Sequence, residues 1–156
     1  MTTNDRQRKR FQNRIAPDVR IESVLALKGA KGPATGHQNI VGRYRERYGL
    51  TNTLGPGRLL GDQWLVLTEN RVLLFAKRGG GIVKRIGPLE HALDRTDITL
   101  QWADYTEALL RKRLVHLTTS DERMNISHTI LDQSGEADRF IGAIGDRARE
   151  IGLQEL

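Results

Sequence analysis

The clearest pattern of apolar positions lies near the centre of the chain. Residues 64–68 read Trp-Leu-Val-Leu-Thr and residues 72–75 read Val-Leu-Leu-Phe, with the polar segment Glu69-Asn70-Arg71 between them. Two short apolar runs around a polar turn are typical of a β-hairpin. Because apolar residues fill consecutive as well as alternate positions, both strands are expected to be covered on both faces.

Five further segments have the pattern of β-strands. Ile98, Leu100 and Trp102 alternate with Thr99 and Gln101, which indicates a strand buried on one face. Gly87-Pro88 is expected to break the chain between two strands. The other four candidate strands cover residues 21–27, 82–86, 109–119 and 124–130.

The period of the pattern changes after the seventh strand. Ser134 is suited to cap a helix N-terminus, and Glu136 and Asp138 would place negative charge in the first turn. The sequence therefore predicts one amphipathic C-terminal helix. Its apolar face would consist of Ala137, Phe140, Ile141, Ile144, Ala148 and Ile151.

Two segments lack these patterns. Residues 1–17 are polar and basic, and we interpret them as a disordered tail before a domain at residues 18–156. Deleting the tail is then expected to leave the fold intact. Phe11 and Ile15 lie four residues apart, which leaves open a short helix or arm that engages an anionic surface. Residues 29–58 form a basic insertion between the first and second strands.

Composition excludes several classes of function. The chain has 156 residues and no cysteine, which excludes disulfides, thiolate metal sites and a cysteine nucleophile. The histidines and carboxylates have no spacing typical of a metal site or an acid–base pair, so we expect no metal, no cofactor and no enzymatic activity. No apolar run is long enough for a transmembrane helix, and no secretory signal is recognised. These features favour a cytoplasmic protein, with peripheral attachment to a membrane as one option.

Charge is distributed unevenly along the chain. The formal net charge is +6, from 25 Lys and Arg against 19 Asp and Glu. Residues 1–95 carry a net charge of +10, and residues 96–156 carry −4. This asymmetry indicates an anionic partner for the first part of the chain.

The central hairpin carries a family resemblance. An apolar run that leads into Thr68-Glu69-Asn70-Arg71 and then into a second apolar run resembles the signature of bacterial pleckstrin-homology (PH)-like domains. Ile86-Gly-Pro-Leu89, followed by an acidic connection to Ile98, is similar to the next segment of the family. The resemblance spans Val19 to Ile151 and implies a mainly β fold, a seven-stranded antiparallel barrel or sandwich capped by the C-terminal helix. The insertion at residues 29–58 departs from the family pattern.

The resemblance also implies candidate binding residues. Phosphoinositide-binding members hold phosphate with a lysine that is followed, after a variable gap, by Lys/Arg-x-Arg near the first hairpin. Phosphate binding requires several converging cationic donors, which such residues supply. A generic basic face and a solvated loop remain open as alternatives for this segment. The candidate anion-binding residues are Lys28, Lys31, Arg43, Arg45 and Arg47.

Taken together, these observations predict a non-enzymatic PH-like binding or adaptor domain that contacts an anionic membrane surface or a protein partner. A protein partner would add a strand to an exposed sheet edge. The alternative is a nucleic-acid-binding protein that uses the basic tail and insertion, with Tyr44 and Tyr48 stacking on bases.

Overall fold

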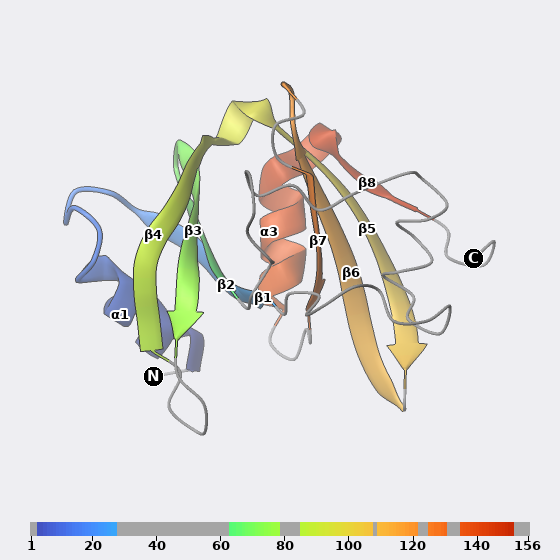
Figure 1. Ribbon diagram of the computed structural model, residues 1–156, viewed down its shortest axis with the longest axis horizontal. Helices are drawn as coiled ribbons and strands as arrows, with labels where there is room; N and C mark the ends of the chain where they lie inside the picture. Colours follow the sequence, from blue (N-terminus) through green and yellow to red (C-terminus); the bar gives the residue numbers. More distant parts are fainter. Residues whose placement is uncertain are drawn as a thin grey trace.

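The computed structural model describes residues 3–27, 63–78, 85–107, 109–121, 125–130 and 135–151. This part of the chain is mainly β, with a helix before the first strand and another near the C-terminus (Figure 1). The elements are, in order, α1 (Thr3–Gln12), β1 (Ile21–Leu27), β2 (Gln63–Thr68), β3 (Arg71–Arg78), β4 (Arg85–Asp94), the 3₁₀ turn η1 (Arg95–Asp97), β5 (Ile98–Glu107), β6 (Leu110–Thr119), β7 (Asn125–Ile130), α3 (Glu136–Ile144), the 3₁₀ turn η2 (Gly145–Arg147) and β8 (Ala148–Glu150).

The described strands form two four-stranded sheets. The first sheet is antiparallel and has the order β1-β2-β3-β4. The second has the order β7-β6-β5-β8, and its last strand pairs in parallel with β5. The predicted mainly β class with a C-terminal helix is confirmed, as is the central hairpin of β2 and β3. The strand pairs of the described residues do not close a barrel.

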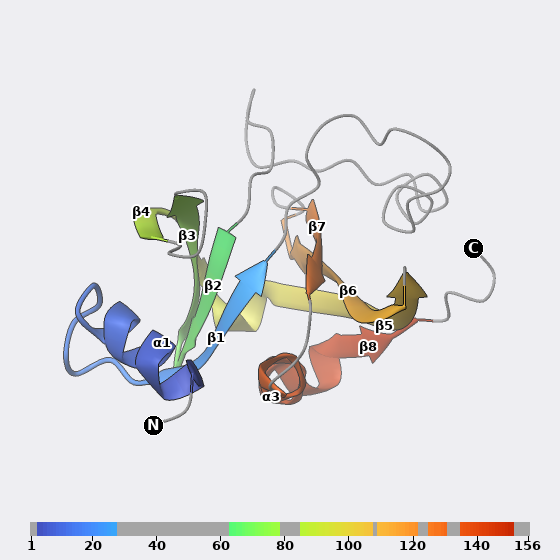
Figure 2. The same ribbon diagram turned by 90° about the horizontal axis from the view of Figure 1, so that it is seen from below.

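The larger hydrophobic cluster lies between the two sheets and is closed by α3. Figure 2 shows α3 at one side of the space between the sheets, beside β1 and β8. Phe140 is the largest side chain that α3 contributes to this cluster, and it is 0% exposed. The buried members of this cluster are Leu25, Leu27, Leu65, Leu67, Val72, Leu74, Ile98, Leu100, Val115, Leu117, Ala137, Phe140 and Ile144.

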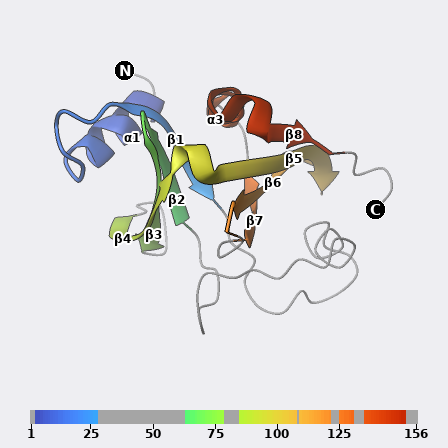
Figure 3. The same cartoon turned by 90° about the horizontal axis from the view of Figure 1, so that it is seen from above.

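A second cluster lies on the other face of the first sheet, under α1. Phe11 of α1 is 0% exposed and packs against Trp64 of β2 and Phe75 of β3. As a result α1 and α3 lie on opposite sides of β1 and β2 (Figure 2, Figure 3). The expectation that both hairpin strands are covered on both faces is confirmed, since β2 is buried throughout and β3 is buried from Val72 to Phe75.

The N-terminal segment differs from the disordered tail that its composition predicts. Residues 3–12 form a regular helix, because Phe11 finds a fully buried site on the sheet and the helix ends carry favourable charges. Asp5 lies in the first turn, and Lys9 and Arg10 lie in the last. The polar composition of this segment did not predict the helix, because only one aromatic residue, Phe11, anchors it to the sheet.

The strand break predicted at Gly87-Pro88 is wrong, because β4 continues through both residues. Two conditions allow this. First, β4 is the edge strand of the sheet formed by the described residues, and at an edge proline removes no essential ladder hydrogen bond. Second, the register shifts between Phe75 and Lys77, opposite this dipeptide. A Cβ at Gly87 would lie 2.7 Å from the Ala76 carbonyl oxygen, so the close approach of β4 to β3 requires glycine.

The C-terminal helix is shorter than its apolar spacing predicts. It ends at Ile144, because Gly145 adopts φ 70° and its amide donates to the Ile141 carbonyl. Ala148 then begins β8, and Ile151 is buried beyond it. The first-turn acids Glu136 and Asp138 lie where predicted, whereas Ser134 falls outside the described residues.

Neither helix in the described part of the chain has the length and apolar character needed to cross a membrane.

Candidate anion-binding face

The five binding residues predicted from the resemblance are outside the part of the chain that the structure describes. The same is true of Tyr44 and Tyr48. A candidate site must therefore be built from the other segment that the charge distribution singled out, the N-terminal helix. The predicted residues in question are Lys28, Lys31, Arg43, Arg45 and Arg47.

The helix α1 has one face toward the protein and one toward solvent. Phe11 is buried and Ile15, just after the helix, packs against the same cluster. Arg6, Lys9 and Arg10 are exposed on the opposite face. This division follows from the 3.6-residue period of the helix, which separates positions 6, 9 and 10 from position 11. Docking of Phe11 therefore fixes a row of cations in place.

A network of hydrogen bonds holds α1 against α3 and β1. Glu136 of α3 is only 3% exposed, and its Oε1 accepts from Arg8 Nη2 at 3.2 Å and from Arg139 Nη1 at 2.9 Å. Its Oε2 accepts from Ser23 Oγ at 2.9 Å. Arg8 also donates to the Glu22 carbonyl at 3.0 Å. Arg8 is therefore a structural cation, in contrast to its exposed neighbours on the same helix.

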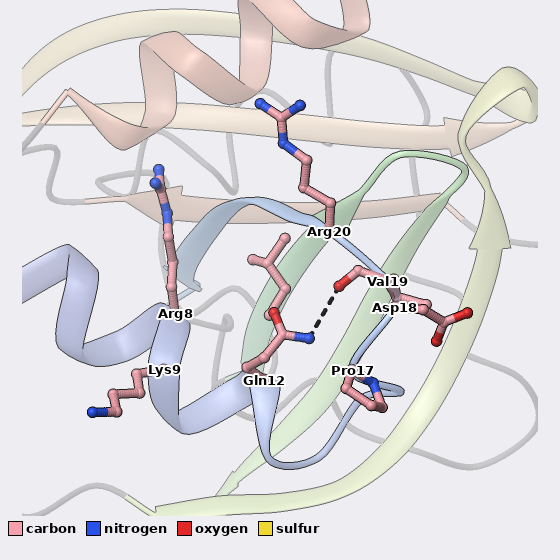
Figure 4. A pocket seen from close by; sticks show the side chains of 8 residues that line it. Arg8, Lys9, Gln12, Pro17, Asp18, Val19 and Arg20 are labelled. Carbon is pink, nitrogen blue, oxygen red and sulfur yellow. Dashed lines mark hydrogen bonds between the residues drawn. The ribbon is translucent and has the colours of Figure 1, made fainter.

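An open pocket of about 390 Å³ lies between α1 and the chain that leads into β1 (Figure 4). Gln12 closes one side by donating to the Val19 carbonyl at 3.0 Å. Figure 4 shows Arg8 and Arg20 extending toward the same side, whereas Lys9 points away from them. With Asp18 as the acidic residue of the lining, the pocket is basic but does not gather its cations around one point. It is better suited to a charged surface than to a single phosphate.

Two exposed cations of the first sheet lie away from the face that α1 covers. Arg78 of β3 and Arg85 of β4 are cross-strand neighbours, and both are exposed. Their chain neighbours Lys77 and Ile86 lie on the α1 side, so strand alternation places this pair on the other face. Like charges directly opposite each other destabilise a sheet, so this pair adds nothing to the fold. Arg14, just after α1, donates to the Ile86 carbonyl at 3.2 Å and so joins the helix to this end of β4.

We call the exposed surface of α1 and of the turn after it the basic face. Its cations lie outside the outer face of the first sheet, which α1 covers (Figure 1). Sequence reasoning noted the charge of residues 1–20 but missed that a folded helix holds much of it. The Phe11–Ile15 spacing was the signal that could have revealed the fixed helix. The basic face consists of Arg6, Lys9, Arg10 and Arg14.

A second ion-pair cluster lies on the other sheet and stabilises the β5–β6 hairpin. Asp104 accepts from Arg113 Nε at 2.6 Å and from Arg113 Nη2 at 3.1 Å, and Arg113 also donates to Asp138 of α3. The same guanidinium lies 4.7 Å from the ring centre of Trp102. Hydrogen bonding to Arg113 lowers the pKa of Asp104, against the opposing effect of burial. Hydrogen bonding to Asp104 likewise raises the pKa of Arg113.

The lowered pKa of Asp104 predicts a pH-dependent contribution to stability. A carboxyl whose pKa is lowered by folding stabilises the protein above its unfolded pKa, near 3.8, and this contribution disappears as pH falls through the folded pKa. We therefore expect Asp104→Asn to lower the free energy of unfolding by about 0.5–1 kcal/mol at pH 7. The difference should shrink below about pH 4, as measured by denaturant unfolding across pH.

In an Arg113→Gln background, Asp104→Asn should give a much smaller pH-dependent difference, because the ion pair is already lost and only the charge of Arg111 still lowers the pKa of Asp104. A difference that stays constant from neutral to strongly acidic pH would contradict the prediction.

The geometry of the described residues contains no group of three His, Asp or Glu side chains that could hold a metal ion. No protein-family model matches the chain, and no curated protein matches its sequence.

Proposed function

We propose that this chain is a non-enzymatic, PH-like binding module that contacts an anionic membrane surface through the basic face. One observation carries the proposal: the exposed cations Arg6, Lys9 and Arg10 are held on a helix whose apolar anchor, Phe11, is fully buried in the protein. The resemblance of the central hairpin and the mainly β fold with its C-terminal helix support the family part of the proposal.

Burial of Phe11 determines how such a helix would bind. Amphipathic helices that lie in a bilayer insert their apolar face between the lipids. In α1 that face is used inside the protein, so the helix presents charge without an insertion surface of its own. Each basic residue near an anionic leaflet contributes about 1 kcal/mol, and the effect decays within a Debye length of about 10 Å at 0.1 M salt. Binding through the basic face should therefore weaken steeply with added salt.

The proposal is tested by the double variant Arg6→Gln/Lys9→Gln. We expect it to weaken co-sedimentation with vesicles of phosphatidylcholine and phosphatidylserine by about 30-fold at low salt, since two cations contribute about 2 kcal/mol together. A matched control is Arg71→Gln/Arg149→Gln, which removes the same charge from exposed positions on β3 and β8, outside the basic face. The control should retain most of the binding.

Three results would contradict the proposal: no binding of the parent protein to these vesicles, equal losses in the two double variants, or binding that does not change with salt. The same assay with DNA and RNA tests the alternative partner. If the protein binds DNA or RNA but not the vesicles, the nucleic-acid interpretation is favoured.

A further inference from the structure

The turn between β5 and β6 contains a leucine that the fold does not need. Leu109 is 97% exposed, and its φ of 65° is the one positive φ of a non-glycine residue among the residues described. It lies between Glu107 and Leu110, which form the last pair of the β5–β6 ladder. Leucine rarely adopts this left-handed region, because its Cβ is crowded there.

Ordinary turn chemistry would place a different residue here. Tight hairpin turns with positive φ favour glycine, asparagine or aspartate, which lower the strain. Leucine adds strain, and at this exposure it gains almost nothing from burial. A single exposed leucine is common on protein surfaces, but a strained one is not, and strained residues gather at functional positions. We therefore infer that the Leu109 side chain contacts an apolar environment outside this chain.

The surroundings of Leu109 favour a lipid bilayer as that environment. The leucine is at the tip of a hairpin, with Glu107 before it at the end of β5 and with exposed Arg111 and half-buried Lys112 following on β6. Asp104, on the facing strand, is paired with Arg113. An apolar tip with more basic than acidic residues next to it suits an anionic bilayer, in which acyl chains lie beneath negative headgroups.

The hairpin and the basic face lie far apart on the molecule. Figure 1 shows the β5–β6 hairpin and α1 at opposite ends of the long axis. The basic face supplies long-range attraction, and an apolar tip would supply the short-range contact that α1 lacks, since Phe11 is buried.

We propose that Leu109 inserts into an anionic bilayer and anchors the protein there together with the basic face. This inference rests on the proposed function, because it assumes that the basic face meets the same membrane. Full burial of a leucine side chain corresponds to a change in affinity of roughly 10- to 100-fold.

The test uses the full chain and vesicles made of equal parts of phosphatidylcholine and phosphatidylserine. Leu109→Asn should weaken binding by roughly 10- to 100-fold, whereas Leu109→Met, which stays apolar, should bind nearly as well as the parent. Asparagine adopts positive φ at lower cost than leucine, so the thermal midpoint of Leu109→Asn should equal or exceed that of the parent. Weaker binding without loss of stability separates insertion from a structural role.

A direct measurement of depth completes the test. In Leu109→Trp, vesicles with brominated acyl chains should quench the added tryptophan, and the parent protein, with Trp64 and Trp102 alone, provides the background. Normal vesicle binding by Leu109→Asn, absence of added quenching, or a lower thermal midpoint in parallel with lost binding would each overturn the insertion. If Leu109→Asn binds normally while Arg6→Gln/Lys9→Gln does not, the insertion fails and the proposed function stands. No vesicle binding by the parent would overturn both.

Discussion

Replacing Phe11 with alanine is expected to lower the free energy of unfolding by about 3–5 kcal/mol. The side chain is fully buried, and its ring lies 5.7 Å from the Trp64 ring and 5.3 Å from the Phe75 ring, measured between centroids. Removing it leaves a cavity between α1 and the sheet, which costs the lost transfer free energy and the lost packing together. Equilibrium unfolding in denaturant, followed by circular dichroism, measures the change.

Lys9→Gln is the matched control for Phe11→Ala, since it changes an exposed position on the same helix and should alter stability by less than about 0.5 kcal/mol. If Phe11→Ala unfolds like the parent, α1 does not contribute to the fold as the structure indicates. The structure also reverses the expectation for deletion of residues 1–17. Without α1 the second cluster, around Trp64 and Val66, would be exposed to solvent. The truncated chain should therefore lose cooperative unfolding or aggregate.

Replacing Phe140 with alanine is also expected to cost about 3–5 kcal/mol in the free energy of unfolding. Phe140 is the largest side chain that α3 places in the core between the sheets, and it is fully buried there. Alanine is the better helix former, so the loss can be assigned to packing and not to helix propensity. Thermal and denaturant unfolding both measure it.

Gly142→Ala on the same helix is the matched control for Phe140→Ala, and its effect should have the opposite sign. A Cβ at Gly142 meets no atom within 4 Å, and the position is exposed, so alanine should stabilise the helix by up to about 1 kcal/mol. No loss of stability in Phe140→Ala would show that α3 does not pack against the core as described, and a loss in Gly142→Ala would show that Gly142 is not the open helical position described here.

The elements that the sequence predicted well are those whose pattern depends on neighbouring residues alone. The β2–β3 hairpin combines two dense apolar runs with a polar turn, and Thr68 Oγ1 accepts from the Arg71 amide at 3.0 Å within that turn. The strand at residues 21–27 matches β1 residue for residue. Two-sided burial of β2 and β3 was also predictable, because their apolar residues have no polar alternation.

The elements that were missed depend on contacts distant in sequence. Short strand β8 forms only because Gly145 ends α3 and residues 148–150 then pair with β5, some fifty positions earlier in the chain. β4 passes through Gly87-Pro88 because it lies at a sheet edge, and edge position is a property of topology. The helix α1 was not predicted because its sequence is polar. A single aromatic residue, Phe11, stabilises it only because the first sheet offers an apolar surface to pack against.

The candidate site divides in the same way. Charge asymmetry pointed to the first part of the chain, and six of the basic residues occur within residues 1–20. Which of them serve structure and which face solvent could not be predicted from the sequence, since Arg8 and Lys9 are adjacent cations with very different surroundings in the fold. Arg8 is bound to buried Glu136 across 128 positions of the chain, whereas Lys9 is exposed. The strained conformation of Leu109 is likewise visible only in three dimensions.

By itself the sequence determined a mainly β protein with a central hairpin covered on both faces, a C-terminal helix and a basic first part. These properties follow from local periodicity and composition, which act over a few residues. Only the tertiary structure decided what covers the outer face of the first sheet, namely the segment that looked most like a tail. The reason is that the hydrophobic effect is non-directional. The outer face of β2 and β3 would be exposed to water without a covering element, and Phe11, distant in sequence, buries that face.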